Sequence, residues 1–157
     1  MASPASVGKH PIHPMLIPFP IALWIFSLIS DLIYGMGWGG IVWKETAFYT
    51  MAGGIIGALA AAIPGYLDYR TTTVPAIQKI GGWHMRINLF LVVLFSINLW
   101  LRTSSEPGAA LPVILSVVGV AMLAVSGWLG GEMVYVHGAA VEPQKETASL
   151  KERDRAA

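Results

Sequence analysis

The sequence predicts an all-α integral membrane protein, a four-helix bundle whose transmembrane helices alternate up, down, up and down. Three observations predict this fold class. Of the 157 residues, 55% are apolar and only 12% are charged, whereas about 25% are charged in an ordinary soluble domain. Eight of the 19 charged residues follow Gly138, so the first 138 residues share eleven. Four segments are apolar over the roughly 20 residues that a helix needs to cross a bilayer. This composition excludes a soluble enzyme, a nucleic-acid binder with a basic patch, and a disordered chain.

The four spans follow one another along most of the chain. We expect them at residues 14–34, 46–67, 85–101 and 111–136, with the third as the shortest. A cytoplasmic or interfacial segment, 1–13, precedes them, and a polar cytoplasmic tail, 137–157, follows them. Glycine, serine, proline and polar residues are typical of turns. They predict the connections at Gly35 to Gly40, at Arg70 to Gly82 and at Thr103 to Gly108.

Basic residues near the span ends predict the orientation, because cytoplasmic loops carry an excess of Lys and Arg. With four spans, both termini and the middle connection share one side. That side carries eight basic residues, and the other side carries only Lys44 and Arg102. We therefore expect both termini on the cytoplasmic side of the membrane.

A stripe of small residues follows one face of the second span. Its members lie four positions apart, at Gly53, Gly57, Ala61 and Gly65. Small residues allow two membrane helices to approach closely. We expect helix packing there, and the same face is our candidate for contact with a redox membrane protein or a second copy of the chain.

All four histidines fall at the predicted cytoplasmic end of the bundle. His10 and His13 precede the first span, His84 opens the third, and His137 closes the fourth. Ionisable groups at membrane depth are functional candidates. The carboxylates of Asp68 and Glu132 lie at the same end, and Asn88 shares a helix face with His84.

This set of side chains predicts a cofactor site. Imidazoles with one or two carboxylates suit Zn, Cu, Fe or Mn, and the candidate metal ligands are His10, His13, His84, His137, Asp68 and Glu132. Two imidazoles on facing helices suit a b-type haem equally well. In that case His84 and His137 are the expected ligands, His13 is a further one, and Asp68 and Asn88 support them. The sequence leaves haem and metal open.

Two weaker signals concern the interior of the bundle. Asp31 lies at the other end of the first span, where we expect a salt link with Lys44. A faint internal repeat relates the two halves of the chain and would place His13 and His84 in equivalent positions. It matches the segment that begins at Pro64 with the one that begins at Ser126.

Several of these residues also carry a family resemblance. The opening His10-Pro-Ile-His13-Pro-Met-Leu-Ile-Pro-Phe-Pro-Ile-Ala-Leu-Trp24 and the later Gly65-Tyr-Leu-Asp68 and Gly127-Trp-Leu-Gly-Gly131 resemble the DUF2231 family of bacterial four-span membrane proteins. The resemblance covers residues 10–140 and implies His13, Asp31, Asp68, His84 and His137 as family-like positions. Similar domains are joined to Rieske or cytochrome c domains in some bacteria, which implies a redox setting.

Three functional hypotheses remain open from sequence. The first is a redox or electron-transfer protein that holds haem or a metal. The second is a non-enzymatic structural or accessory subunit, and the third is a small ion or proton transporter. No nucleophile elbow, phosphate loop or zinc-protease pair is present, so no catalytic residue is predicted.

Overall fold

The computed structural model describes residues 3–104 and 109–141 and consists almost entirely of helices. Two short strands and a short helix begin the chain, four long helices follow, and one π-helical turn closes the described part. The elements are β1 (Ser6–Val7), β2 (His10–Pro11), α1 (Ile12–Leu16), α2 (Pro18–Gly35), α3 (Ile41–Thr71), α4 (Pro75–Ser104), α5 (Ala110–Gly131) and η1 (Glu132–Val136). Four stretches are long and apolar enough to cross a membrane, as the sequence predicts: Ile12–Gly35, Ile41–Thr71, Pro75–Ser104 and Ala110–Val136. The third, with 30 residues, is not the shortest as expected, because α4 begins ten residues before the predicted span; the first, with 24, is the shortest.

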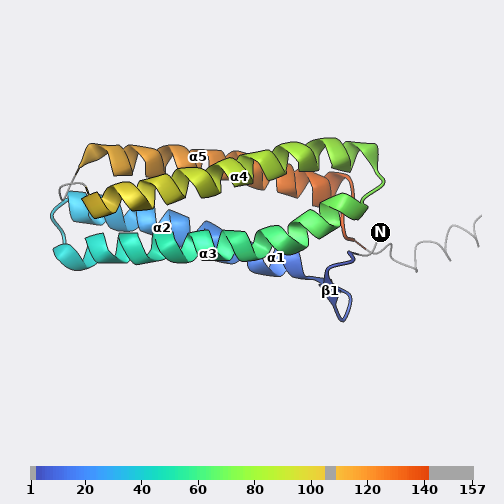
Figure 1. Cartoon of the computed structure of the whole chain (residues 1–157), viewed down its shortest axis with the longest axis horizontal. Coiled ribbons are helices and arrows are strands. Elements are labelled where there is room, and N and C mark those ends of the chain that lie inside the picture. The colour runs from blue at the N-terminus through green and yellow to red at the C-terminus, as the bar shows by residue number, and fades with distance from the viewer. Residues whose placement is uncertain (1–2, 105–108, 142–157) are drawn as a thin grey trace, which may run out of the picture.

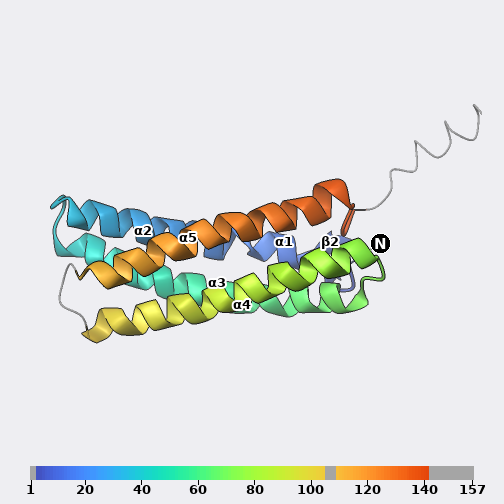
Figure 2. The ribbon, with the colours of Figure 1, turned by 90° about the horizontal axis from the view of Figure 1, so that it is seen from above.

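The four long helices run along one axis, and successive helices point in opposite directions (Figure 1). The hairpin formed by α2 and α3 lies beside the hairpin formed by α4 and α5. Helix α2 packs on α3 and α5, while α4 also packs on α3 and α5. Figures 1 and 2 together show that α2 lies diagonally opposite α4 across the bundle axis. Side chains from α2 and α4 that point inward therefore meet on this axis.

The first span is broken near its start, where the sequence predicts one continuous helix. Helix α1 ends at Leu16, and α2 begins at Pro18. Proline has no backbone N–H and cannot donate the helical hydrogen bond. Pro18 and Pro20 therefore interrupt the hydrogen-bond ladder between the two helices. As a result, His13 lies on a five-residue helix, which Ile17 joins to α2 through its backbone N–H bond to the carbonyl of His13.

The predicted connection from Arg70 to Gly82 is wrong in extent. Only residues 72–74 separate α3 from α4, so both helices continue well beyond the apolar segments. The pair Gly81 and Gly82 suggests a turn, but both residues lie inside α4 and are buried. A Cβ on Gly81 would lie 3.1 Å from the ring of Tyr69 and 3.4 Å from the sulfur of Met133. The glycines thus allow close packing of neighbouring elements.

The segment before the first span contains a small hairpin that the sequence analysis did not predict. Strands β1 and β2 are antiparallel and are joined by Gly8 and Lys9, both with positive φ. Two such residues form the tight turn that suits a two-residue hairpin loop. The hairpin lies at the histidine end of the bundle (Figure 1). Of the predicted tail, 137–157, only residues 137–141 fall within the described part, as do only Thr103 and Ser104 of the predicted connection Thr103 to Gly108.

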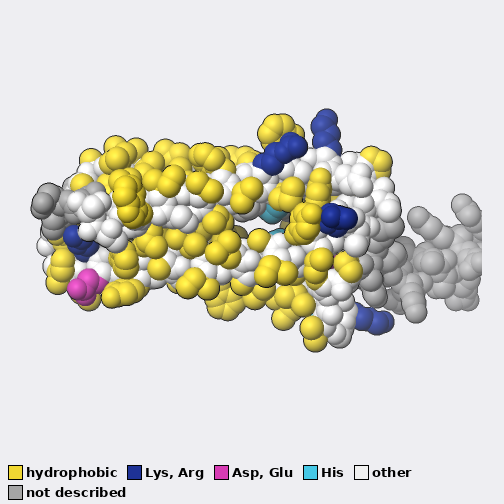
Figure 3. Space-filling model, viewed as in Figure 1, with side chains coloured by type: hydrophobic (Ala, Val, Ile, Leu, Met, Phe, Trp, Pro, Cys, Tyr) yellow, Lys and Arg dark blue, Asp and Glu magenta, His cyan; other side chains and the backbone are white. Residues whose placement is uncertain are grey.

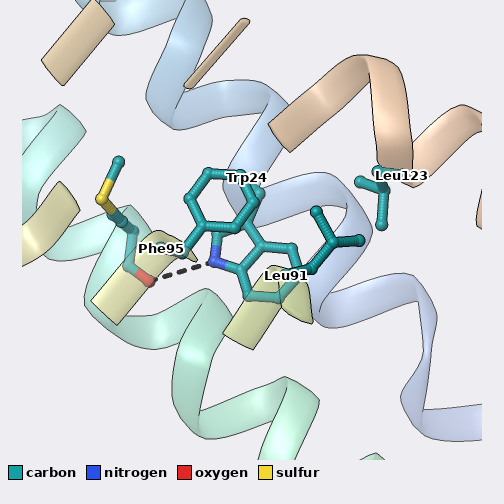
Figure 4. Close-up of a cluster of buried hydrophobic side chains, with 5 residues drawn as sticks. Trp24, Leu91, Phe95 and Leu123 are labelled. Carbon is teal, nitrogen blue, oxygen red and sulfur yellow. Dashed lines mark hydrogen bonds between the residues drawn. The ribbon is translucent and has the colours of Figure 1, made fainter. Parts of the chain in front are cut away.

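The core is centred on two aromatic rings from diagonally opposed helices. Trp24 of α2 and Phe95 of α4 stack with ring centroids 4.3 Å apart and planes 15° from parallel. Leu91 and Leu123 pack around them, and the indole N–H of Trp24 donates to the carbonyl of Met51 (Figure 4). This hydrogen bond is needed, because the bilayer core has no water that could accept from the indole N–H instead.

The small-residue stripe of α3 packs inside the chain. A Cβ on Gly53 would lie 3.3 Å from Leu23, and one on Gly57 would lie 3.2 Å from Pro20. One on Gly65 would lie 2.7 Å from the ring of His13. The packing interpretation is therefore correct. The expectation that this face, which includes Ala61, meets a second protein is wrong, because α1 and α2 cover it.

Candidate functional site

Two histidines from opposite sides of the bundle meet near its axis. His13 comes from α1 and His84 from α4, and both are partly buried. Their ring centroids are 6.4 Å apart, and the ring planes are nearly perpendicular, at 89°. The sequence predicts both at the same end of the bundle, with His84 and His137 as the principal ligands and His13 as a further one. The structure instead pairs His84 with His13.

Each ring of this pair is fixed by a backbone carbonyl of a neighbouring helix. Nδ1 of His13 lies 2.8 Å from the carbonyl oxygen of Ala61, and Nδ1 of His84 lies 3.0 Å from that of Ser126. A carbonyl oxygen only accepts hydrogen bonds, so both Nδ1 atoms must carry the proton. In the neutral imidazole, Nε2 then has a free lone pair. Within the described residues, neither Nε2 atom has a hydrogen-bond partner.

The carbonyl that holds His13 lies where α3 is weakened by a proline. Pro64 is inside α3 and removes one donor from the turn that precedes it. The missing bond would have ended at the carbonyl of Ala60, one residue before Ala61. In the second hairpin, Leu129 occupies the position equivalent to Pro64, and the carbonyl of Ser126 accepts from His84 all the same. Pro64 is therefore not a signal for the contact between Ala61 and His13.

His84 has additional hydrogen-bonding neighbours on its own side. The amide of Asn88 donates to the hydroxyl of Ser126 at 2.6 Å and to the backbone carbonyl of His84 at 2.8 Å. The same hydroxyl lies 3.1 Å from Nδ1 of His84. Asn88 therefore reaches the imidazole through Ser126. The sequence analysis includes Asn88 among the supporting residues but misses Ser126, whose buried position in α5 the helix pattern does not reveal.

The two halves of the chain place equivalent residues in equivalent roles. Three pairs of residues meet across the axis at one constant separation of 71 residues: His13 with His84, Trp24 with Phe95, and Asp31 with Arg102. Ser27 and Asn98 share this interval, and each donates to a carbonyl of the partner helix in its own hairpin, at Ala47 and Pro112.

The second helices of the hairpins match as well. Gly54 of α3 faces Trp24, and Gly119 of α5 faces Phe95 in the same way. Gly65 and Gly130 lie against His13 and His84. The chain is therefore a repeat of two helical hairpins around an approximate two-fold axis. The repeat expected from sequence is therefore present, but its alignment of α3 with α5 is different. Gly65 is equivalent to Gly130 and not to Gly127.

The other predicted ligands lie apart from this pair. His10 is exposed in the N-terminal hairpin, where its Nδ1 lies 2.9 Å from the carbonyl oxygen of Gly8. His137 follows η1, which Glu132 begins. Asp68 accepts a hydrogen bond from the hydroxyl of Ser3 at 2.5 Å. Within residues 3–104 and 109–141, no three histidine or acidic side chains gather as a metal-binding group.

At the other end of the axis, Asp31 is paired with Arg102 and not with Lys44. The guanidinium donates to both carboxylate oxygens, at 2.7 and 2.5 Å, and each side chain is only 7% exposed. Arg102 also donates to the side-chain oxygens of Asn98 and Ser116. The salt link expected for Asp31 thus exists, but its partner is wrong. Helix-end position in sequence favours Lys44, whereas the repeat brings Arg102 onto the axis.

The space-filling view adds one feature of the histidine end. On the face shown in Figure 3, histidine atoms are visible at the bottom of a recess between the upper and the lower helix pair. Apolar side chains lie on both sides of this recess, and Lys or Arg side chains lie beyond it toward the histidine end. The recess therefore opens on the side of the bundle.

The fold and the histidine pair define a class of four-span membrane proteins built from two repeated helical hairpins. The chain belongs to the family described as "Predicted membrane protein (DUF2231)", whose model matches residues 9–143. The match confirms the family that the sequence motifs resemble. No curated protein and no solved structure matches this chain.

Proposed function

We propose that this protein holds a redox metal centre in the membrane, with His13 and His84 as its two protein ligands. The observation that carries the proposal is the shared arrangement of the two imidazoles. Each donates its Nδ1 proton to a backbone carbonyl and keeps the Nε2 lone pair for another partner. Metal-bound histidines almost always donate their second ring nitrogen in this way, because the bond fixes both the tautomer and the ring orientation.

The separation of the rings supports a single metal atom between them. A metal bound at about 2.0–2.1 Å from an imidazole nitrogen lies roughly 3.2 Å from the ring centroid. Two imidazoles that held one metal would therefore have ring centroids no more than about 6.4 Å apart. The rings of His13 and His84 are 6.4 Å apart. The approximate two-fold axis supports the same conclusion, since a ligand on this axis contacts both histidines equally.

The number of ligands favours a b-type haem over a bare ion. Two imidazoles complete the coordination of a haem iron, because the porphyrin supplies the other four nitrogens. A bare Zn, Cu, Fe or Mn ion needs further ligands. No third histidine or acidic residue joins the pair within the described part of the chain. The finer assignments to His10, His137, Asp68 and Glu132 carry less support.

The core above the pair supports electron transfer in preference to a proton path. Between the histidines and the ion pair, the stacked rings of Trp24 and Phe95 occupy the axis. These apolar rings interrupt any chain of polar groups that could carry protons between the histidines and the ion pair. We further propose the bacterial cytoplasmic membrane as the location, with both termini inside, on the basis of the basic residues at the histidine end.

Purification in detergent tests the proposal directly. The natural protein is examined for a Soret absorbance band, which indicates haem, and for bound Zn, Cu, Fe and Mn by elemental analysis. Protein without cofactor is also titrated with haemin and with each metal ion. We expect His13→Gln and His84→Gln to weaken binding at least 10-fold, a change within the range for a lost ligand or its support.

His10→Gln and His137→Gln are the matched controls, because these histidines lie outside the pair. We expect both controls to bind as the natural chain does. A protein that binds neither haem nor a metal ion contradicts the proposal. Binding that depends on His10 and His137, but not on His13 and His84, contradicts the ligand assignment.

A further inference from the structure

We infer that the two histidines of the pair are unequal: His84 is the fixed ligand, and His13 is the exchangeable one. This inference rests on the proposed function. It assigns the site a second property, namely a coordination position that a small exogenous ligand can take when His13 leaves. Carbon monoxide, cyanide and free imidazole represent the chemistry of such a ligand, which is a compact donor of one electron pair.

The hydrogen bonds of the two imidazoles differ in number. His13 has a single partner, the carbonyl oxygen of Ala61. His84 contacts both the carbonyl oxygen and the hydroxyl of Ser126. That hydroxyl is held in turn by the amide of Asn88, at 2.6 Å. Rotation of the His84 ring must therefore disturb a network, whereas rotation of the His13 ring breaks one bond.

The repeat shows why only one histidine has this network. In the first hairpin, the position equivalent to Ser126 is Ala61, which has no hydroxyl. The position equivalent to Asn88 is Ile17, which has no amide. The backbone carbonyl is present in both hairpins, so the halves share the ring orientation. Only the second hairpin has side chains that support this orientation. Asn88 and Ser126 are therefore the positioning residues of His84.

The elements that carry the histidines differ in the same sense. His84 lies within α4, a continuous helix of 30 residues. His13 lies in α1, a helix of five residues that ends before Pro18. The preceding segment is attached through β2 and the tight turn at Gly8 and Lys9. Proline has no N–H to donate, so the backbone around His13 has fewer helical hydrogen bonds to hold it than the backbone around His84.

Access to the pair fits a small ligand. Histidine atoms are visible in the recess between the two helix pairs, and apolar side chains lie on both sides of it (Figure 3). Small uncharged molecules such as carbon monoxide dissolve in the hydrocarbon of the bilayer. The recess therefore gives them a route to the histidines from the side of the bundle.

The first experiment uses the protein without cofactor. Nitrogen-15 labelling of the histidine rings allows the Nδ1 protons to be followed by NMR, with assignment from His13→Gln and His84→Gln. We expect the Nδ1 proton of His84 to exchange with water at least 10-fold more slowly than that of His13. We expect Ser126→Ala to remove this difference and Ser126→Thr, which keeps the hydroxyl, to preserve it.

The second experiment uses the protein reconstituted with haemin and then reduced. We expect carbon monoxide to displace His13, so that His13→Ala, studied at a haemin concentration that saturates its weakened site, binds carbon monoxide at least 10-fold faster than the natural chain. His84→Ala is expected to lose the haem. The double variant Ile17→Asn/Ala61→Ser copies the network onto His13, and we expect it to slow the binding of carbon monoxide.

The outcomes separate the inference from the proposed function. Equal exchange of the two Nδ1 protons, or faster exchange at His84, overturns the inference even if haem binds. Displacement of His84 by carbon monoxide overturns it as well. A chain that binds no haem and no metal overturns the proposed function, while the exchange rates of the two protons still decide whether the pair is unequal.

Discussion

Asp31 and Arg102 form a two-pronged ion pair across the bundle axis, at the end opposite the histidines. The carboxylate of α2 receives one hydrogen bond on each oxygen from the guanidinium of α4. The two residues occupy equivalent positions of the repeat, so opposite charges meet where two copies of one residue would repel each other. The ion pair therefore holds the two hairpins together at a position where two identical charges would push them apart.

Removing one charge of this pair should be strongly destabilising. Asp31→Asn leaves the guanidinium buried without a counter-charge, and loss of one partner of a buried pair typically costs about 3–5 kcal/mol. We expect the free energy of unfolding, measured by titration of mixed micelles with dodecyl sulfate, to fall by about this amount. Arg102→Gln should behave similarly.

The exchanged pair, Asp31→Arg/Arg102→Asp, is the matched control for this effect. The approximate two-fold axis places the two charges in similar surroundings, so the exchanged pair should recover more than half of the loss. Stability equal to that of the natural chain in Asp31→Asn would show that the ion pair contributes nothing.

Two glycines should tolerate no side chain, because aromatic rings lie against them. A Cβ on Gly54 would overlap the indole of Trp24, and one on Gly119 would lie 2.6 Å from the ring of Phe95. Overpacking of a core costs about 1–3 kcal/mol. We expect Gly54→Ala and Gly119→Ala to lower the free energy of unfolding by this amount in the same titration.

Gly127 provides a control within the same helix as Gly119. No atom lies within 4 Å of a Cβ built there. Gly127→Ala should leave stability unchanged or raise it slightly, because alanine is the better helix former. Equal losses at Gly119 and Gly127 would mean that helix propensity, and not contact with Phe95, determines the effect.

The stacked pair offers a test of the repeat. Trp24→Phe removes volume and the hydrogen bond to Met51, and Phe95→Trp adds volume beside Gly119. Each change alone should destabilise the bundle by about 1–3 kcal/mol. The double variant keeps the total volume, and we expect it to lose at least 1 kcal/mol less than the sum of the single changes. A double variant whose loss equals the sum would show that the rings act independently.

The four spans are predictable from sequence because their signal is local, namely about 20 consecutive apolar residues. The helix ends are less predictable, since most of the polar and glycine residues from Arg70 to Gly82 are helical, and only residues 72–74 form the connection. The pairing of His13 with His84 depends on contacts between diagonal helices. No local pattern encodes such contacts, and only the repeat, read in the correct register, points to them.

The same reasoning explains the wrong partner of Asp31. From sequence, Lys44 is near it at the end of the next span, whereas Arg102 is 71 residues away. Once the histidines are aligned, Asp31 and Arg102 become equivalent positions that face each other. The register of α3 against α5 needs the structure, because Gly54 with Gly119 and Gly65 with Gly130 are too few matches to fix it.

The orientation in the membrane is open to a simple labelling test, because the natural chain has no cysteine. Single cysteines are introduced as Lys9→Cys in the N-terminal hairpin and as Trp38→Cys between α2 and α3. Both positions are exposed, and they lie at opposite ends of the bundle. In intact bacterial cells, we expect a membrane-impermeant maleimide to label Trp38→Cys only. Lys9→Cys should react after the membrane is permeabilised, because the excess of basic residues predicts that its end lies in the cytoplasm. The reverse labelling pattern would place the histidine pair at the outer face of the membrane.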